Sequence, residues 1–177
     1  IQQVQASLDE ARSATKRIGV ALLSSTAHEF VFVRAAVLRA WTGGPLPKHQ
    51  NLRAALGADR LVVLKFGFRD MAERSELSQK ILTVSHRWTE PGHADPNGTQ
   101  LEAVSKFLRE NPKIEFVWFD FWSLPQMERS REENDVFRST LDRIYMLFIG
   151  ARVLILLDLT YMGRFWTSYE AWLAMRM

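Results

Sequence analysis

Near the end of the chain, a carboxylate occupies a position that the residue spacing assigns to the apolar face of a helix. Trp166, Glu170 and Leu173 stand at i, i+4 and i+7, positions that share one face of an α-helix. A buried carboxylate is destabilising unless it is paired, hydrogen-bonded or used in chemistry. Glu170 is therefore the candidate catalytic residue, and the alternative is a structural carboxylate neutralised by Arg164 or Arg176.

Three short apolar runs predict the strands that would position this helix, and predicted helices separate them. This alternation indicates an α/β protein with parallel βαβ units. Right-handed crossovers bring the carboxyl ends of the three strands to one edge of the sheet, where open α/β sheets bind ligands. The expected strands are Ile81–Val84, Ile114–Asp120 and Arg152–Leu157, and the expected helices are Thr99–Glu110, a helix opened by the capping box of Ser130 and Glu133 and stopped at Gly150, and the segment with Glu170.

Polar and aromatic side chains follow each of the three predicted strands. We expect them to line one crevice that holds two carboxylates, an imidazole, two guanidinium groups and several indoles. Aromatic faces beside cationic groups suit a flat ring joined to phosphate or sugar. Taken singly, His86 could instead cap its strand, and Arg87 could simply pair with Asp120. The candidate binding residues are Ser85, His86, Arg87, Trp88, Asp120, Trp122, Gln126, Arg164 and Trp166, with Glu170 as the catalytic candidate.

The first part of the chain carries no chemical signature. Its pattern predicts a mostly helical N-terminal extension over residues 1–78, in front of an α/β domain at residues 79–177. The chain stops inside an apparent helix, so we expect the domain to be truncated at its C-terminus. Within the extension we expect an amphipathic helix over residues 1–24, a helix Ala27–Trp41, a helical turn Asn51–Leu56 and a strand Leu61–Phe66.

Composition excludes several classes of protein. Of the 177 residues, 47% are hydrophobic and 24% are charged, as in ordinary soluble globular proteins. The net charge of +3 is dispersed, which argues against a nucleic-acid partner. The sequence has no cysteine, which excludes disulfides and thiolate metal sites. Without a signal peptide or a run of 18 apolar residues, a soluble cytoplasmic protein that does not bind membranes is expected.

Two kinds of ligand motif are also absent from the sequence. No glycine-rich phosphate loop follows any predicted strand, so the Walker and dinucleotide fingerprints are missing. His86 and His93, with Asp95 nearby, do not have the spacing of a known zinc motif. We therefore predict no metal site.

Four blocks of the sequence resemble the fungal heterokaryon-incompatibility (HET) domain. The resemblance covers residues 81–172. The blocks are VSHRW, VWFDFWSLPQ, the RIY of the second predicted helix, and RFWTSYE. The residues that match the family's pattern are Ser85, Trp88, Val117, Trp118, Asp120, Gln126, Arg164, Trp166, Thr167 and Glu170.

HET domains are similar to Toll/interleukin-1 receptor (TIR) domains, so the resemblance implies a flavodoxin-like parallel sheet. In enzymatic TIR domains, a glutamate four residues after a tryptophan cleaves the nicotinamide–ribose bond of NAD, and Trp166 and Glu170 have this spacing. The resemblance thus implies an NAD nucleosidase that uses NAD as substrate and needs no cofactor. It also implies self-association and a role in innate immunity, cell death or self/non-self signalling.

The resemblance leaves several points open. A non-catalytic TIR-like interaction module and a sensor that binds a nucleotide-derived signal without cleaving it are alternatives to the enzyme. Stacking on the rings of NAD is implied for Trp88, Trp122 or Trp166, and contact with the diphosphate for Arg87 or Arg164. The sheet of a TIR domain has five strands. Either further sequence supplies the missing ones, or the Leu61–Phe66 strand substitutes.

Overall fold

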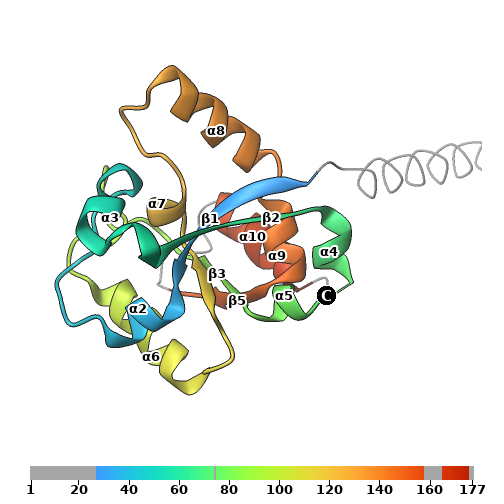
Figure 1. Cartoon of the computed structure of the whole chain (residues 1–177), viewed down its shortest axis with the longest axis horizontal. Coiled ribbons are helices and arrows are strands. Elements are labelled where there is room, and N and C mark those ends of the chain that lie inside the picture. Colours follow the sequence, from blue (N-terminus) through green and yellow to red (C-terminus); the bar gives the residue numbers. More distant parts are fainter. Residues whose placement is uncertain (1–26, 74, 158–164, 176–177) are drawn as a thin grey trace, which may run out of the picture.

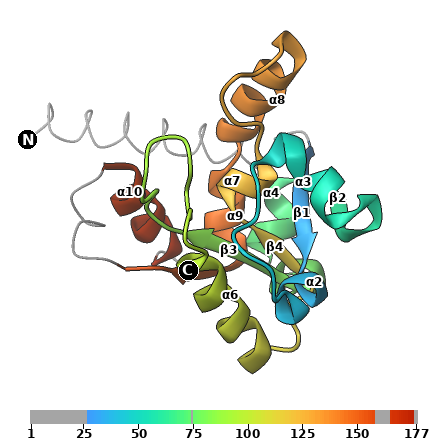
Figure 2. The same ribbon diagram turned by 90° about the vertical axis from the view of Figure 1, so that its left-hand side faces the viewer.

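The structure, a computed structural model, describes residues 27–73, 75–157 and 165–175, with side chains from residue 168 onward in the last segment. The predicted amphipathic helix over residues 1–24 lies outside this part of the chain. The fold is an open, mixed α/β sheet flanked by helices (Figures 1 and 2). Its five strands are β1 (His28–Arg34), β2 (Leu61–Phe66), β3 (Ile81–Ser85), β4 (Phe116–Trp118) and β5 (Arg152–Ile155), in the spatial order β2-β1-β4-β3-β5.

Helices connect and cover these strands. None of the helices in the described part of the chain has the length and apolarity that crossing a bilayer requires. In chain order they are α2 (Ala35–Ala40), α3 (His49–Leu56), the 3-10 helix η1 (Ala58–Arg60), α4 (Phe68–Ala72), α5 (Glu76–Gln79), α6 (Thr99–Glu110), α7 (Asp120–Ser123), α8 (Arg131–Leu141), α9 (Tyr145–Gly150) and α10 (Phe165–Ala174).

The three strands predicted to be parallel are parallel. β3 is central, with Ile81 opposite Phe116 of β4 and Ser85 opposite Ile155 of β5. The chain therefore leaves β3 to form β4 on one side and then crosses back to form β5 on the other. Such a reversal of strand order opens a crevice at the carboxyl ends of the strands. In this sheet the strand order reverses between β3 and β5.

The predicted helix at Ala27–Trp41 is wrong for its first half, because residues His28–Arg34 form β1. The run Phe30–Val33 consists of aromatic and β-branched residues, which pack well on a pleated sheet. Phe30 and Phe32 belong to one core cluster and Val33 to the other, the two-residue alternation of a strand. β1 pairs antiparallel with both β2 and β4, so residues 28–66 contribute two strands to the sheet.

Several predicted boundaries hold and others shift. The Leu61–Phe66 strand, the helix Thr99–Glu110 and the capping box of Ser130 and Glu133 are confirmed. The helix expected to continue to Gly150 is divided into α8 and α9. α8 is rich in charged residues and projects away from the body (Figure 1), whereas apolar α9 packs on the sheet. The second parallel strand is also shorter than predicted, since α7 begins at Asp120.

The core has two halves, one on each face of the sheet. One half contains buried residues of α2, α3 and α6, and the other contains buried residues of α4, α9 and α10. Side chains of β3 alternate between them, with Leu82 and Val84 in the first half and Ile81 in the second. Ser85 follows the alternation of Ile81, so its side chain faces α10.

Gly150, at the end of α9, has no room for a side chain. A Cβ there would lie 2.5 Å from the Cβ and 2.6 Å from the backbone oxygen of Met71. We expect Gly150→Ala to lower the free energy of unfolding by about 2 kcal/mol, because the backbone of α4 must move. Urea unfolding followed by tryptophan fluorescence measures this. Gly44→Ala is the control, since a Cβ at Gly44 meets nothing within 4 Å; equal stability of the two variants would contradict the packing of α9 on α4.

Candidate active site

Glu170 of α10 contacts the carboxyl end of β3. The Ser85 hydroxyl donates a hydrogen bond of 2.5 Å to Glu170 Oε2. Glu170 is 8% exposed and Ser85 is fully buried. The predicted burial of this carboxylate on the inner face of a helix is therefore confirmed, and its described partner is a serine of β3, the middle one of the three parallel strands.

Its surroundings raise the pKa of Glu170 to about 7. Burial is the largest cause, because it penalises the charged form. The hydrogen bond from Ser85 opposes this, the negative charge of Asp120 adds to it, and the charge of His86 again opposes it. Near neutral pH, Glu170 is therefore poised between its protonated and ionised forms.

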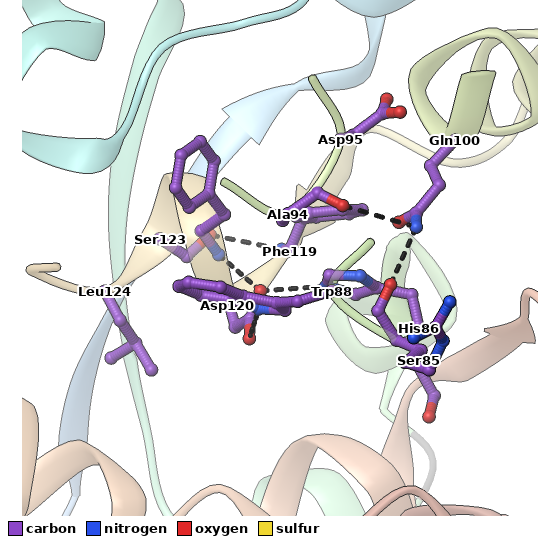
Figure 3. A network of polar contacts seen from close by, with 12 residues as sticks. Ser85, His86, Trp88, Ala94, Asp95, Gln100, Phe119, Asp120, Ser123 and Leu124 are labelled. Carbon is purple, nitrogen blue, oxygen red and sulfur yellow. Dashed lines mark hydrogen bonds and ion pairs between the residues drawn. The ribbon is translucent and has the colours of Figure 1, made fainter. Parts of the chain in front are cut away.

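Asp120 is the second carboxylate at this edge of the sheet, and three donors surround it. His86 Nε2 lies 2.8 Å from Oδ1, the backbone N–H of Phe121 donates to the same oxygen at 2.5 Å, and Trp88 Nε1 donates to Oδ2 at 2.9 Å. Figure 3 shows this network. Burial raises the pKa of Asp120, but the charge of His86 and the hydrogen bonds from His86, Trp88 and Phe121 outweigh it, so the pKa is lower than usual.

The His86 ring is held by stacking as well as by Asp120. It lies on Phe119 with centroids 3.8 Å apart and an interplanar angle of 21°. Phe119 in turn stacks on Trp122 at 4.2 Å. The imidazole thus forms the outer layer of an aromatic stack that extends into the core.

The pKa values of Asp120 and Glu170 are shifted in opposite directions, that of Asp120 down and that of Glu170 up. Asp120 stays ionised to low pH, whereas Glu170 titrates near neutrality. Two carboxyl groups with separated pKa values are typical of sites in which one holds a charge and the other exchanges a proton. This arrangement can stabilise a developing positive charge and move a proton.

Five of the predicted site residues come together at this edge, namely Ser85, His86, Trp88, Asp120 and Glu170. Trp122 does not join them. It is 1% exposed, because the turn into α7 directly after β4 directs its indole into the core. The structure therefore corrects the expectation that Trp122 stacks on a ligand.

The remaining predicted residues have other positions. Gln126 is buried and donates to the carbonyl oxygens of Asp120 (2.9 Å) and Leu124 (2.8 Å), so it fastens the chain after α7. Arg87 follows His86, and its carbonyl oxygen accepts from Gln100. Arg164 lies outside the described residues, as does the side chain of Trp166.

Sequence reasoning missed the residues that fasten the loop between β3 and α6. Gln100 Nε2 donates to the carbonyl oxygen of Arg87 at 2.8 Å. The buried Asp95 accepts from the backbone N–H of Leu101 at 2.8 Å and so caps the start of α6. Asp95 stands three residues before Gly98, the N-cap residue of α6, so the rule for N-cap residues does not point to it.

Two hollows in the described part of the molecule lie away from Glu170. One, of about 770 Å³, is lined by Lys80, Ile114 and Arg152 among others, at the amino ends of the parallel strands. The other, of about 650 Å³, lies between α2 and α3 beside Trp41. The segment that leads into α10, residues 158–164, is outside the described residues. We therefore define the site by its polar contacts.

Known proteins assign no ligand to this site. Comparisons of the chain with protein-family models, with curated proteins and with solved structures found no match. Within the described residues, no group of three His, Cys, Asp or Glu side chains could hold a metal ion. Function must therefore be argued from the geometry and the sequence blocks.

Replacing Asp120 with asparagine tests the network. A lowered pKa in the folded state means that the carboxylate stabilises the fold above its unfolded pKa of about 3.8, and that this contribution is lost as the pH falls. We expect Asp120→Asn to lose about 1 kcal/mol of unfolding free energy at neutral pH, and less in acid. Urea midpoints at the two pH values measure this. Asp135→Asn, at an exposed position of α8, should change neither midpoint; a pH-independent loss in Asp120→Asn would refute the charge-based explanation.

Proposed function

We propose that the chain is a flavodoxin-like TIR/HET-like domain that hydrolyses the nicotinamide–ribose bond of NAD, with Glu170 as the catalytic carboxylate. The observation that carries this proposal is a buried carboxyl group with a pKa of about 7 at the carboxyl end of the central parallel strand. The strand order β4-β3-β5 supports it, because it corresponds to the first three strands of the flavodoxin-like order 2-1-3-4-5. In that order, ligands bind where the strand order reverses, which here is between β3 and β5.

The chemistry suits the groups at this site. Breaking an N-glycosidic bond develops an oxocarbenium-like positive charge on the ribose, and nicotinamide leaves with the bonding electron pair as a neutral molecule. A carboxylate beside the ribose stabilises that charge, most strongly where water is excluded. The positive charge of the nicotinamide ring favours the ionised form of a nearby carboxyl group that titrates near neutrality. Glu170 would therefore be ionised when NAD is bound.

The other predicted residues receive roles from the resemblance. Trp88 or Trp166 is proposed to stack on a ring of NAD, and Arg87 or Arg164 to contact its diphosphate. We further propose that the protein is cytoplasmic, self-associates, needs no cofactor, and acts in immune, cell-death or self/non-self signalling. The four sequence blocks support these proposals.

A second candidate is a domain that binds an ADP-ribose compound, or a protein partner, without turnover. The buried hydrogen bond between Ser85 and Glu170 favours this non-catalytic candidate, because a carboxylate that is 8% exposed and already hydrogen-bonded also fits a structural role. In that case Glu170 would hold α10 on β3.

Incubation with NAD separates these candidates. The protein is held at high concentration, so that self-association is favoured, and free nicotinamide and ADP-ribose are separated by chromatography over time. Equimolar release of both supports hydrolysis. Binding of ADP-ribose, measured by calorimetry, without release of nicotinamide would support the sensor. If neither nicotinamide release nor ADP-ribose binding is observed, the result would favour the interaction module.

A further inference from the structure

His86 has one ring nitrogen without a partner in the described part of the molecule. Its Nε2 faces Asp120 Oδ1 at 2.8 Å, and its side chain is 2% exposed. Its Nδ1 is buried and has no hydrogen-bond partner among the described residues. A buried polar atom left unsatisfied by protein groups indicates a bound water molecule or a ligand group.

The hydrogen bonds around Asp120 determine which nitrogen of His86 carries the proton. Asp120 also accepts from Trp88 Nε1 and from the backbone N–H of Phe121, and these two donors favour an ionised carboxylate. An ionised carboxylate only accepts hydrogen bonds, so His86 Nε2 must donate. In the neutral imidazole, Nδ1 then carries a lone pair and is an acceptor.

This acceptor belongs to the same edge of the sheet as Glu170. His86 directly follows Ser85, whose hydroxyl donates to Glu170. When His86 is protonated, its positive charge also acts on the carboxyl group of Glu170. Stacking on Phe119 and the bond to Asp120 hold the ring in one orientation (Figure 3). An oriented imidazole with a free lone pair is the arrangement that general bases use.

We propose that His86 is a second acid–base residue of this site, and that its Nδ1 accepts a proton from the water molecule that attacks the ribose. The inference rests on the proposed hydrolysis of NAD. In this step the water oxygen bonds to the anomeric carbon, the bond from that carbon to the nicotinamide nitrogen breaks, and its electron pair neutralises the nicotinamide ring. One water proton passes to Nδ1, and Asp120 stabilises the imidazolium until the proton returns to solvent. Atoms and charges balance without an oxidant or reductant.

His86→Gln tests this role. The amide nitrogen of glutamine can still donate to Asp120, but no base remains at the position of Nδ1. We expect kcat to fall about 100-fold while KM stays within about threefold of the wild-type value. His28→Gln is the matched control, because His28 on β1 also has a side-chain partner, Thr140 at 2.9 Å; it should retain the wild-type kcat.

Nitrogen-15 NMR of the wild-type protein gives a second measurement that needs no turnover. The neutral ring of His86 should carry its proton on Nε2, and the Nδ1 signal should shift when ADP-ribose is added. A proton on Nδ1, or no shift of its signal at saturating ADP-ribose, overturns the proposal even if His86→Gln fails to fold. An active wild type with an equally active His86→Gln refutes this inference alone. A wild type that releases no nicotinamide refutes the proposed hydrolysis and this inference together.

Discussion

Replacing Glu170 with glutamine is expected to lower the rate of nicotinamide release from NAD by at least about 100-fold, the usual effect of removing a group that stabilises transition-state charge. Glutamine has the size of glutamate and can still accept the hydrogen bond from Ser85. The variant therefore removes the negative charge while α10 stays on β3. Because the charge is needed as positive charge develops on the ribose, kcat should fall more than KM changes.

Chromatographic measurement of nicotinamide at several NAD concentrations gives both constants. Glu102→Gln is the matched control, because Glu102 is exposed on α6 and carries the same change of charge. Its rate should equal that of the wild type. Retention of wild-type kcat in Glu170→Gln would show that the carboxylate is structural, even if the protein proves to be an NAD hydrolase.

The parallel half of the fold was predictable because its signals are local. Apolar runs such as Ile81–Val84 are bounded by polar residues, and crossover handedness then assigns their carboxyl ends to one edge. The capping box of Ser130 and Glu133 is equally local and was confirmed. Ser85 and Glu170 were both assigned to that edge, but the hydrogen bond between them was not predicted, because the sequence offered Arg164 and Arg176 as partners of Glu170.

Other features depend on contacts between distant segments. The run Phe30–Val33 suits a strand only because β2 and β4 lie on either side of it, and neither neighbour is visible in the local pattern. Trp122 follows a predicted strand, yet the tight turn into α7 buries it on Phe119. From the sequence, His86 could either cap its strand or contact a ligand. In the structure its ring contacts Asp120 and stacks on Phe119, and no spacing rule predicts either contact.

The same buried carboxyl group should make the wild-type fold less stable as the pH rises. The pKa of Glu170 is raised from 4.5 to about 7 in the folded protein. Between these values the folded state binds more protons than the unfolded state, so the unfolding free energy falls with increasing pH. The favourable contribution is complete below about pH 4.5 and is lost as the pH passes through about 7. A shift of this size corresponds to about 3 kcal/mol.

Glu170→Gln isolates this effect, because the variant has no charge to bury while every other titrating group remains. The unfolding free energy of each protein is measured in urea at several pH values. The value for the variant minus the value for the wild type should rise by about 3 kcal/mol between acid and mildly alkaline conditions. The Asp120 contribution runs in the opposite direction, rising with pH, and is present in both proteins. A constant difference across the pH range would mean that Glu170 is already ionised in the folded state. The carboxylate would then be solvated or paired, and a site that depends on its burial beside Ser85 would be ruled out.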